Sequence, residues 1–289
     1  MASTIPMAMV EQFSANVFLQ TQQEETILRP TVYTESVKGM SKYVDSIGRV
    51  ARPVKVTTRH APTPIVATPH ERRQLSLEFY SHGDMIDEID KVRMLYDPTS
   101  IYVKAFSAIF GTEIDRIILD QIVGTARIGQ KGESTKELPD KQKIDAVAAF
   151  TVAELRAIKQ VFDWNNVKEK EKKYLCISPD EVAKLLADTE LTSSDYNTVK
   201  ALVDGKVDTF MGFTFVKSTV IPTHVVGGVT KRKCVAYTSD AFRLGIGINP
   251  TIRITENPNY SYGVQVFMRM GLGGVRVEDR KVVQVDCNV

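Results

Sequence analysis

Apolar residues recur at helical spacing over a long central stretch of the chain. Residues 97–124 begin with Asp97-Pro98, a helix-capping residue followed by proline at the first helical position. The apolar residues along the stretch include Ile101, Ala105, Ala108, Ile109, Ile117 and Ile118. Because they cover much of the helix surface, the pattern predicts a long helix over about 98–124 that lies on a sheet along most of its length.

A different pattern precedes this helix. Residues 29–82 contain Pro30, Pro53, Pro62, Pro64 and Pro69. Prolines at this density exclude a helix or a central strand but allow edge strands and hairpin legs. The run 54–58 is β-rich, and apolar side chains alternate with polar ones over 75–80, as in a strand with one covered face. We expect an extended arm and a long β-hairpin whose partner is another chain.

Two capping boxes mark further helices. Thr151 with Glu154 predicts a helix to about 162, and Ser178 with Glu181 predicts one to about 187. A strand is expected between them at 173–177. Weaker periodicity favours helices at 9–23 and 194–203, whereas the Gly- and Lys-rich residues 124–142 are typical of a loop.

The rest of the chain mixes strands with short helices. Strands are expected at 214–216, 234–237 and 262–270, a helix at 239–244, and a closing hairpin with legs at 275–277 and 282–285. Since these elements show no regular βαβ repeat, the sequence favours the α+β class.

Size and charge restrict the function. The chain has 289 residues with 43% hydrophobic and 25% charged residues, which is typical of a folded protein of about two domains. The net charge of +2 is too balanced for a protein that binds nucleic acid mainly by neutralising phosphates. Cys176, Cys234 and Cys287 are too scattered for a disulfide framework or a zinc knuckle, so we expect small buried side chains. No stretch is apolar for long enough to span a bilayer, and we expect no membrane partner.

Charge is distributed unevenly around the predicted hairpin. Residues 29–73 carry nine basic and three acidic side chains, whereas residues 78–97 are mainly acidic. A basic extension beside an acidic body favours head-to-tail contacts between copies. We expect contacts between subunits in which Arg52, Arg59, Arg72 and Arg73 pair with Asp84, Asp87 and Glu88 of a neighbour. Two solvated charged faces are the simpler alternative.

The order of these elements resembles the major capsid proteins of tailed bacteriophages, which share the Hong Kong 97-like fold. The resemblance covers nearly the whole chain and depends on order and spacing rather than on one motif. It is carried by DPTSIYVKAFSAIFGTEIDRIILDQIVGTA (97–126), YLCISPDEVAKLL (174–186), DYNTVKALVDGKVDTFMGFTFVKS (195–218), CVAYTSDAFRLGIG (234–247) and GLGGVRVEDRKVVQVDC (271–287).

The resemblance implies a domain layout. Residues 1–40 would form an N-terminal arm and residues 41–82 the extended E-loop. Residues 83–164 and 256–289 would form the P-domain, with its spine helix and β-ribbon, and residues 165–255 the A-domain. Copies would assemble into hexamers and pentamers of an icosahedral head that encloses the double-stranded DNA genome, assembled in the host bacterial cytoplasm.

The resemblance also implies partners. A portal protein would occupy one vertex, and contact with packaged DNA would be loose. A decoration protein is an optional further partner on which the sequence does not decide. Many relatives carry a scaffolding domain of about a hundred residues before the arm, but this sequence starts almost directly with the arm. We therefore expect a separate scaffolding protein and no cleavage of the coat.

No catalytic, metal-binding or cofactor-binding residues are expected. Gly271, Gly273 and Gly274 lack the strand–turn–helix context of a phosphate loop and favour a turn or bulge. The acidic run from Asp84 to Asp90 misses calcium-loop spacing, and the four histidines have no zinc-ligand spacing. There is no GxSxG motif.

Some relatives join subunits by a bond between lysine and asparagine. Lys42 or Lys55 and Asn249 or Asn257 are conceivable partners, but nothing in their spacing selects them. Two alternatives stay open: an encapsulin-type compartment of the same fold with an enzyme cargo, and a soluble α+β enzyme with an acidic pocket.

Overall fold

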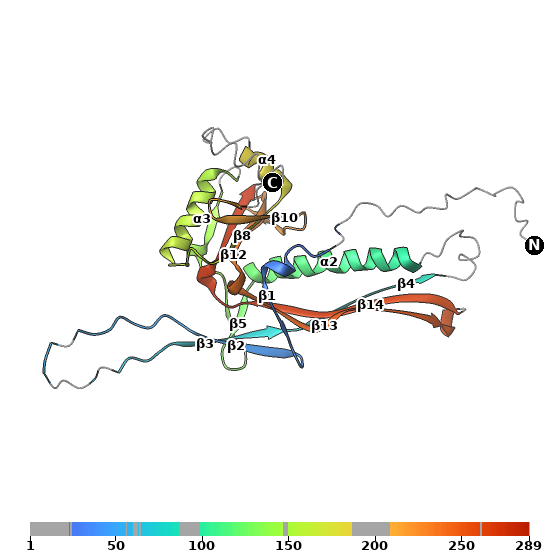
Figure 1. Ribbon diagram of the computed structural model, residues 1–289, viewed down its shortest axis with the longest axis horizontal. Coiled ribbons are helices and arrows are strands. Elements are labelled where there is room, and N and C mark those ends of the chain that lie inside the picture. Colours follow the sequence, from blue (N-terminus) through green and yellow to red (C-terminus); the bar gives the residue numbers. More distant parts are fainter. Residues whose placement is uncertain are drawn as a thin grey trace, which may run out of the picture.

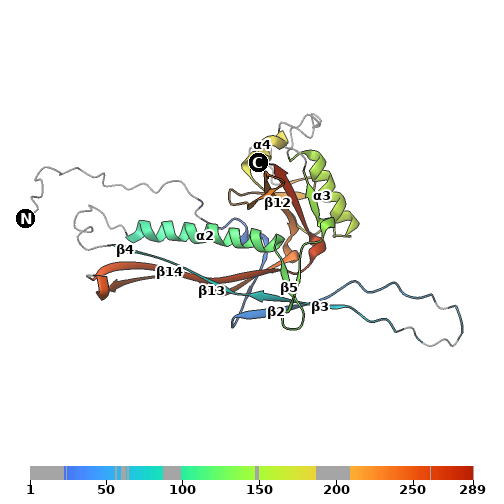
Figure 2. The same cartoon turned by 180° about the vertical axis from the view of Figure 1, so that it is seen from behind.

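The molecule is elongated, with a compact upper lobe above a long ribbon and a hairpin that projects from one end (Figures 1 and 2). A computed structural model describes residues 23, 25–55, 57–59, 63, 65–86, 99–146, 150–186, 209–260 and 262–288. Its described strands form three sheets, and helices lie on two of them, so the expected α+β class is confirmed.

The lower sheet is a long ribbon in the strand order β1-β13-β14-β4. Its strands are β1 (Tyr33–Ser36), β4 (Glu78–Ile86), β13 (Phe242–Asn257) and β14 (Gly263–Arg276). Helix α2 (Thr99–Val123) runs along this ribbon, as the apolar pattern predicted (Figure 1). The predicted Asp97-Pro98 cap lies outside the described residues.

The ribbon corrects two sequence predictions. The helix expected at 239–244 is wrong, because only a 3-10 turn (Ser239–Ala241) precedes β13. Phe242 and Leu244 are buried on either side of the half-buried Arg243, and Gly245 weakens a helix, so the local sequence suits a strand. The strand expected at 262–270 is confirmed but continues to Arg276.

The upper lobe is built on a sheet in the order β7-β15-β12-β8-β10-β9, with β11 also paired to β12. Its strands are β7 (Lys143–Asp145), β8 (Lys173–Ile177), β9 (Thr209–Phe210), β10 (Phe213–Lys217), β11 (Thr223–Val226), β12 (Val229–Thr238) and β15 (Val282–Asn288). Helices α3 (Val152–Trp164) and α4 (Pro179–Leu186) belong to the same lobe. The strands predicted at 173–177, 214–216 and 234–237 are confirmed.

Both predicted capping boxes are present. Glu154 accepts hydrogen bonds from the backbone N–H and hydroxyl of Thr151, and the Thr151 hydroxyl accepts one from Ala153 N–H. Glu181 binds Ser178 in the same way at the start of α4. The helices predicted at 9–23 and 194–203 fall on residues that, except for Gln23, lie outside the described ones.

The predicted closing hairpin near the end of the chain is wrong. Strand β14 ends at Arg276 in the lower sheet, whereas β15 pairs with β12 and β7 in the upper sheet. The 3-10 turn η5 (Asp279–Lys281) carries the chain from one sheet to the other. Each run of valines therefore pairs with a strand distant in sequence rather than with the other run.

The third sheet forms the base of the projecting hairpin in the order β2-β3-β5-β6. Its strands are β2 (Ser41–Ile47), β3 (His70–Ser76), β5 (Ala126–Ile128) and β6 (Ser134–Lys136). The loop expected over 124–142 is therefore only partly right. Strands β5 and β6 have three residues each, too short for an alternation to be detected in the sequence.

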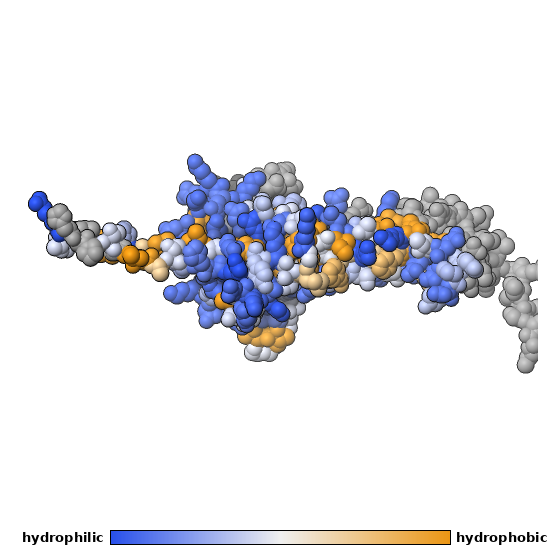
Figure 3. All heavy atoms as spheres, turned by 90° about the horizontal axis from the view of Figure 1, so that it is seen from below, coloured by the Kyte–Doolittle hydropathy of each residue, from blue (hydrophilic) through white to orange (hydrophobic). Residues whose placement is uncertain are grey.

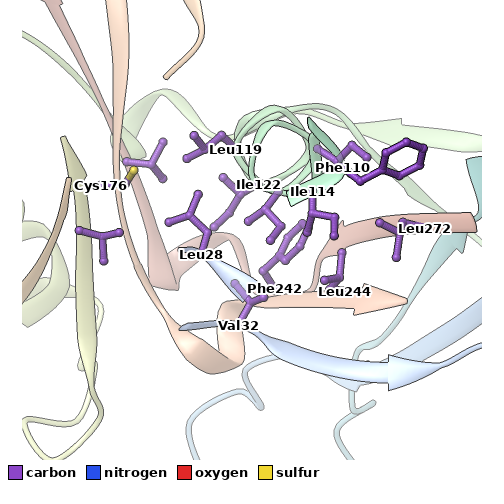
Figure 4. Packing of buried hydrophobic residues seen from close by; sticks show 14 of the residues in the cluster. Leu28, Val32, Phe110, Ile114, Leu119, Ile122, Cys176, Phe242, Leu244 and Leu272 are labelled. Atoms are coloured by element: carbon purple, nitrogen blue, oxygen red, sulfur yellow. The ribbon is translucent and has the colours of Figure 1, made fainter. Parts of the chain in front are cut away.

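One hydrophobic core joins α2 to the ribbon and to one face of the upper sheet. Figure 4 shows Leu119 and Ile122 of the helix near Leu28, Cys176 and Phe242, all of them buried. Full burial of such side chains contributes roughly 1.5–3 kcal/mol each. A second core lies between α3, α4 and the upper sheet, and includes Leu155, Phe162, Leu175, Phe213 and Val283.

Candidate functional site

The outer part of the projecting hairpin makes few contacts with the rest of its own chain. Its two strands pair from Ser41↔Ser76 to Ile47↔His70, and one further backbone hydrogen bond joins Gly48 N–H to Pro69 O at 2.9 Å. Beyond that bond, residues 49–55 and 65–69 belong to no strand among the described residues, although 54–58 was expected to be β-structured. Extended backbone of this kind leaves donors and acceptors for another partner.

The distal hairpin also exposes apolar side chains. Ile65 is 96% exposed, and Ile47, Val50, Val54 and Val66 are also exposed. Figure 3 shows hydrophobic atoms along the projecting segment, close to its junction with the body. Exposed apolar residues gathered on a thin extension are typical of a contact surface.

The sequence-predicted basic residues do not share one environment. Arg52 and Arg59 are exposed on the distal hairpin. Arg72 is half-buried, and its guanidinium binds Asp45 on the opposite strand through Nε–Oδ1 (2.6 Å) and Nη2–Oδ2 (3.1 Å). This hydrogen bond lowers the pKa of the Asp45 carboxyl. A pair so exposed contributes little to stability.

Arg73 is placed differently from the sequence-based expectation. It is 1% exposed, and its Nη1 and Nη2 donate to Oδ1 and Oδ2 of Asp279 at 2.8 and 2.9 Å. The alternation of a strand explains this, because Arg72 and Arg73 point to opposite faces of β3. We therefore correct the assignment of Arg73 to a contact between subunits.

Of the predicted acidic partners, Asp84 is exposed on β4, an edge strand of the ribbon that pairs with β14. Asp87 and Glu88 lie outside the described residues. The acidic partners therefore start on the ribbon, while Arg52 and Arg59 lie on the hairpin that projects from the other end (Figure 1). Among the described residues, Arg52 and Arg59 on the hairpin and Asp84 on the ribbon belong to separate parts of the fold.

Asp279 is the centre of a buried polar cluster at the base of the hairpin. It also accepts from Arg276 Nε at 2.7 Å, and Lys136 Nζ lies 3.2 Å from its Oδ2. Burial alone would raise the pKa of Asp279, but the hydrogen bonds and charges of Arg73 and Arg276 lower it well below its ordinary value. The carboxylate is therefore ionised at neutral pH.

Arg276 connects this cluster to the spine helix. Its Nη1 donates to the carbonyls of Ile122 (3.0 Å) and Gly124 (2.5 Å), at the C-terminal end of α2. Its Nη2 donates to the carbonyl of Lys136 at 3.1 Å. A cation at this end satisfies carbonyls without helical partners and interacts favourably with the helix dipole.

A second buried carboxylate holds the N-terminal segment. Asp115 of α2 is 0% exposed and accepts hydrogen bonds from Ile27 N–H (2.9 Å) and Leu28 N–H (3.0 Å). It also accepts from the Thr26 hydroxyl and the Gln23 amide. Nearby, the hydroxyls of Thr31 and Tyr237 are 2.5 Å apart. Sequence reasoning missed Asp115, Arg276 and Asp279.

The glycines once considered for a phosphate loop lie within strand β14. Gly271 pairs with Ile248 where the register with β13 shifts, so the expected bulge is confirmed. Gly273 has another role, since a Cβ placed there would lie 1.9 Å from Ser76 O. The end of β3 therefore crosses the ribbon in direct backbone contact.

The structure also shows the surroundings of the cysteines and of the residues considered for a bond between subunits. The three cysteines are buried and unpaired, as expected, and burial raises the pKa of the Cys176 thiol. Lys42 binds Glu35 at 2.8 Å, and Asn257 donates to Gln265 at 3.1 Å, each within the chain. In the described part of the chain, no group of three or more histidine, cysteine, aspartate or glutamate residues is placed to hold a metal ion. No helix among these residues is long and apolar enough to cross a membrane.

The cavities at the base of the hairpin carry mixed charge. One of about 630 Å³ is lined partly by Asp45, Glu71 and Arg72. Another of about 410 Å³ is lined partly by Arg49 and Lys136. Both cavities are lined by cations as well as carboxylates, which does not match the acidic pocket of the enzyme alternative.

Comparison with known structures identifies the fold. A capsid structure of the cyanophage P-SCSP1u is 16% identical, with 96% of this chain and 93% of that chain covered and a TM-score of 0.72. A structure of Mycobacterium phage Che8 is 16% identical, with coverages of 97% and 98% and a TM-score of 0.72. An acidic stable capsid of Helicobacter pylori bacteriophage KHP30 is 10% identical, with coverages of 98% and 97% and a TM-score of 0.73. The chain thus has the Hong Kong 97-like fold.

A search among curated proteins finds no match. The family described as phage capsid protein, however, matches residues 5–289, which is nearly the entire sequence. That match agrees with the fold, with the projecting hairpin and with the resemblance found in the sequence, and it favours a phage shell over the encapsulin alternative. The chain belongs to the phage capsid protein family.

Proposed function

We propose that this capsid protein assembles into hexamers and pentamers, and that each hairpin reaches across a neighbouring copy to lie against its ribbon. The observation that carries the proposal is the distal hairpin, whose extended legs expose apolar side chains and have no strand partner in the described chain. Such a segment is stabilised only when another surface covers it.

Charge supports the choice of surface. Arg52 and Arg59 are exposed on the distal hairpin, and Asp84 is exposed on β4, the edge strand of the ribbon. Asp87 and Glu88, outside the described residues, extend the acidic sequence beyond that strand. Complementary patches of this kind guide encounter and fix register more than they add affinity. Arg72 joins this contact only if it leaves Asp45.

The domain layout is part of the same proposal. Residues 1–40 act as the arm, 41–82 as the E-loop, 83–164 and 256–289 as the P-domain, and 165–255 as the A-domain around the symmetry axes. The packing adds two details to these boundaries. Helix α3 and strand β15 share the core of the upper lobe, so both contribute to the support of the A-domain.

The remaining partners follow from a closed shell. A separate scaffolding protein would guide assembly in the host cytoplasm, a portal would occupy one vertex, and a decoration protein would bind the outer surface. The net charge of +2 suits a lining that contacts double-stranded DNA loosely. The chain acts in this scheme as a structural component of the virion.

Charge reversal tests the proposed contact. We expect the double variant Arg52→Glu and Arg59→Glu to remain folded by circular dichroism but to lose closed shells in electron micrographs, alone and with a scaffolding protein. The matched control is Lys168→Glu and Lys170→Glu, which changes the net charge equally at exposed positions of the upper lobe. Shells at wild-type yield from the hairpin variant would refute the contact.

A compensating change makes the test specific. Adding Asp84→Lys to Arg52→Glu restores opposite charges across the proposed interface and should recover part of the shell yield. Asp84→Lys added to the lysine control should reduce the yield instead. Equal yields from these two combinations would show that Asp84 is not the partner.

A further inference from the structure

We propose that Arg73, Asp279 and Arg276 form an orientation lock that fixes the direction of the hairpin relative to α2 before any neighbouring copy is met. The inference rests on the proposed function, in which the hairpin reaches a neighbouring chain. It adds a positioning role for three residues that are buried at the base of the hairpin.

Besides the lock, β3 of the hairpin pairs over Arg73 and Gln74 with the short strand β5. Its sheet meets the body through a small apolar cluster of Val37, Leu75, Leu77, Ala126 and Val275. Apolar contacts of this kind are not directional, so they hold the base close without fixing its angle. An exposed hydrogen bond from Arg49 to Asn165 O (2.8 Å) adds one strut to the upper lobe.

The lock supplies directional contacts. Arg73 belongs to β3 of the hairpin and binds both oxygens of Asp279, at 2.8 and 2.9 Å. A planar guanidinium that binds a carboxylate with two parallel hydrogen bonds fixes orientation as well as distance. Arg73 Nη1 also donates to Arg276 O at 2.8 Å.

Arg276 connects Asp279, and with it the hairpin strand β3, to the end of helix α2. It binds Asp279 through Nε and the last carbonyls of α2 through Nη1. Lys136 of β6 completes the arrangement, with its Nζ 3.2 Å from both Asp279 Oδ2 and Glu71 Oε1. Three segments distant in sequence therefore meet at the Asp279 carboxylate: the hairpin, the end of the ribbon and the β5–β6 unit. Arg276 joins them to the end of the helix.

A pivot lies three residues from the lock. At Gly273 the backbone of β14 lies so close to Ser76 O that a Cβ would not fit. This contact fixes one point of β3, and Arg73 fixes a second point about 10 Å along the strand. Two fixed points determine the direction of the strand, and the pivot alone does not.

The length of the hairpin makes the position of its tip sensitive to the angle at its base. From Ser41 to Thr58 the hairpin extends at most about 55 Å, at roughly 3.3 Å per residue. A rotation of about 5° at the base then moves the tip by about 5 Å, which is one spacing between paired strands. A small angular error therefore places the distal legs one strand away from the surface they should meet.

The test is a distance measurement in the unassembled chain, so it does not depend on shell formation. Two spin labels report the direction of the hairpin by pulsed electron paramagnetic resonance. One is attached at Thr58→Cys on the exposed distal hairpin, and the other at Arg116→Cys on the exposed side of α2. The native cysteines are buried and do not compete for label in the folded chain. We expect one narrow distance distribution for the otherwise wild-type protein.

Asp279→Asn keeps the shape of the side chain but removes its charge and one acceptor. We expect the distribution of distances between the two labels to broaden and its mean to shift by about 5 Å or more, the displacement of the tip that a rotation of about 5° at the base produces. Arg73→Lys, which keeps the charge but loses the two-bond geometry, should broaden it as well. Asp140→Asn, at an exposed ion pair with Lys143 in the same part of the fold, is the control and should leave it unchanged.

The outcomes are distinct. If both lock variants fold and give the wild-type distribution, Asp279 is only a structural residue and the lock is refuted. If the distributions broaden but shells form at wild-type yield, the hairpin direction does not matter for assembly and the positioning role is refuted. Broadened distributions with reduced or irregular shells support the proposal. Failure of the Arg52 and Arg59 test would leave the distance result intact, so the two proposals fail separately.

Discussion

The carboxylate of Asp115 provides the most direct test of how the N-terminal segment is held. It accepts four hydrogen bonds, two from backbone N–H groups and two from side chains. Asp115→Ala removes every acceptor at once. Leu28, one of the donors, is fully buried, so water cannot replace the lost partner without opening the core.

The size of the effect follows from these contacts. A buried unsatisfied N–H costs about 1–3 kcal/mol, and each of the three part-exposed hydrogen bonds contributes about 0.5 kcal/mol. We expect Asp115→Ala to weaken attachment of the segment by about 3 kcal/mol, and Asp115→Asn, which keeps one acceptor oxygen, by about 1 kcal/mol. A loss of 3 kcal/mol corresponds to roughly a hundredfold change in the opening equilibrium.

Hydrogen exchange measures this opening directly. Exchange of the amides of Ile27 and Leu28, followed by mass spectrometry on a peptide that covers 25–32, should accelerate about a hundredfold in Asp115→Ala. Asp120→Ala, at an exposed position of the same helix, serves as the control and should change the rate little. Exchange in Asp115→Ala within threefold of wild type would refute the view that this carboxylate anchors the segment.

Three further predictions concern other parts of the fold. Thr151→Ala should lower the free energy of unfolding by about 1 kcal/mol in urea titrations, because α3 loses its capping box. Gly273→Ala should cost about 3 kcal/mol in the same assay, since its Cβ meets the carbonyl oxygen of Ser76, and a loss below about 1 kcal/mol would contradict the close crossing. Because the pKa of Asp279 is lowered in the folded chain, its stabilising effect is complete above about pH 3.9, the ordinary value for an unfolded aspartate, and declines as the pH falls below it. Asp279→Asn should flatten that acidic decline in thermal unfolding measured from pH 5 to pH 2, and an unchanged slope would contradict the assignment.

The elements that the sequence predicted well are those specified by neighbouring residues. The capping boxes at Thr151 and Ser178 set helix starts through contacts three residues apart, and the structure has both. The long helix at 99–123 is similarly local, because its apolar positions lie on one continuous segment. Local signals of this kind need no knowledge of the fold.

The failures have a common physical cause. The valines at 282–285 pair with β12, which is distant in sequence, so their closeness to 275–277 was misleading. Asp115 meets donors 87 to 92 residues away, and Asp279 meets Arg73 across 206 residues. Contacts between distant residues leave no periodic signal in a single sequence. The sequence therefore predicted the hairpin as the region of contact, but it did not predict Asp115, Arg276 and Asp279, which hold the extended segments.

Arg73 is an instructive exception, because a local signal for its burial was present. It lies on the same face of the strand as Leu75 and Leu77, which are buried, whereas Arg72 lies on the opposite face and is only half-buried. Counting every arginine of the hairpin as a surface charge ignored this alternation. A charged residue on the buried face of a strand indicates a buried partner of opposite charge, since an isolated buried charge is too costly.

Two of the buried carboxylates hold segments that are distant in sequence. Asp115 binds residues 26–28, ahead of strand β1, and Asp279 binds Arg73 at the base of the hairpin. The apolar cores fix how closely the elements pack, but an extension that departs from a core needs directional contacts to fix its course. A buried ion network is weak evidence for stability, since an apolar replacement is often as stable. The position of the Asp279 network at the base of the projecting hairpin is better explained by direction than by stability.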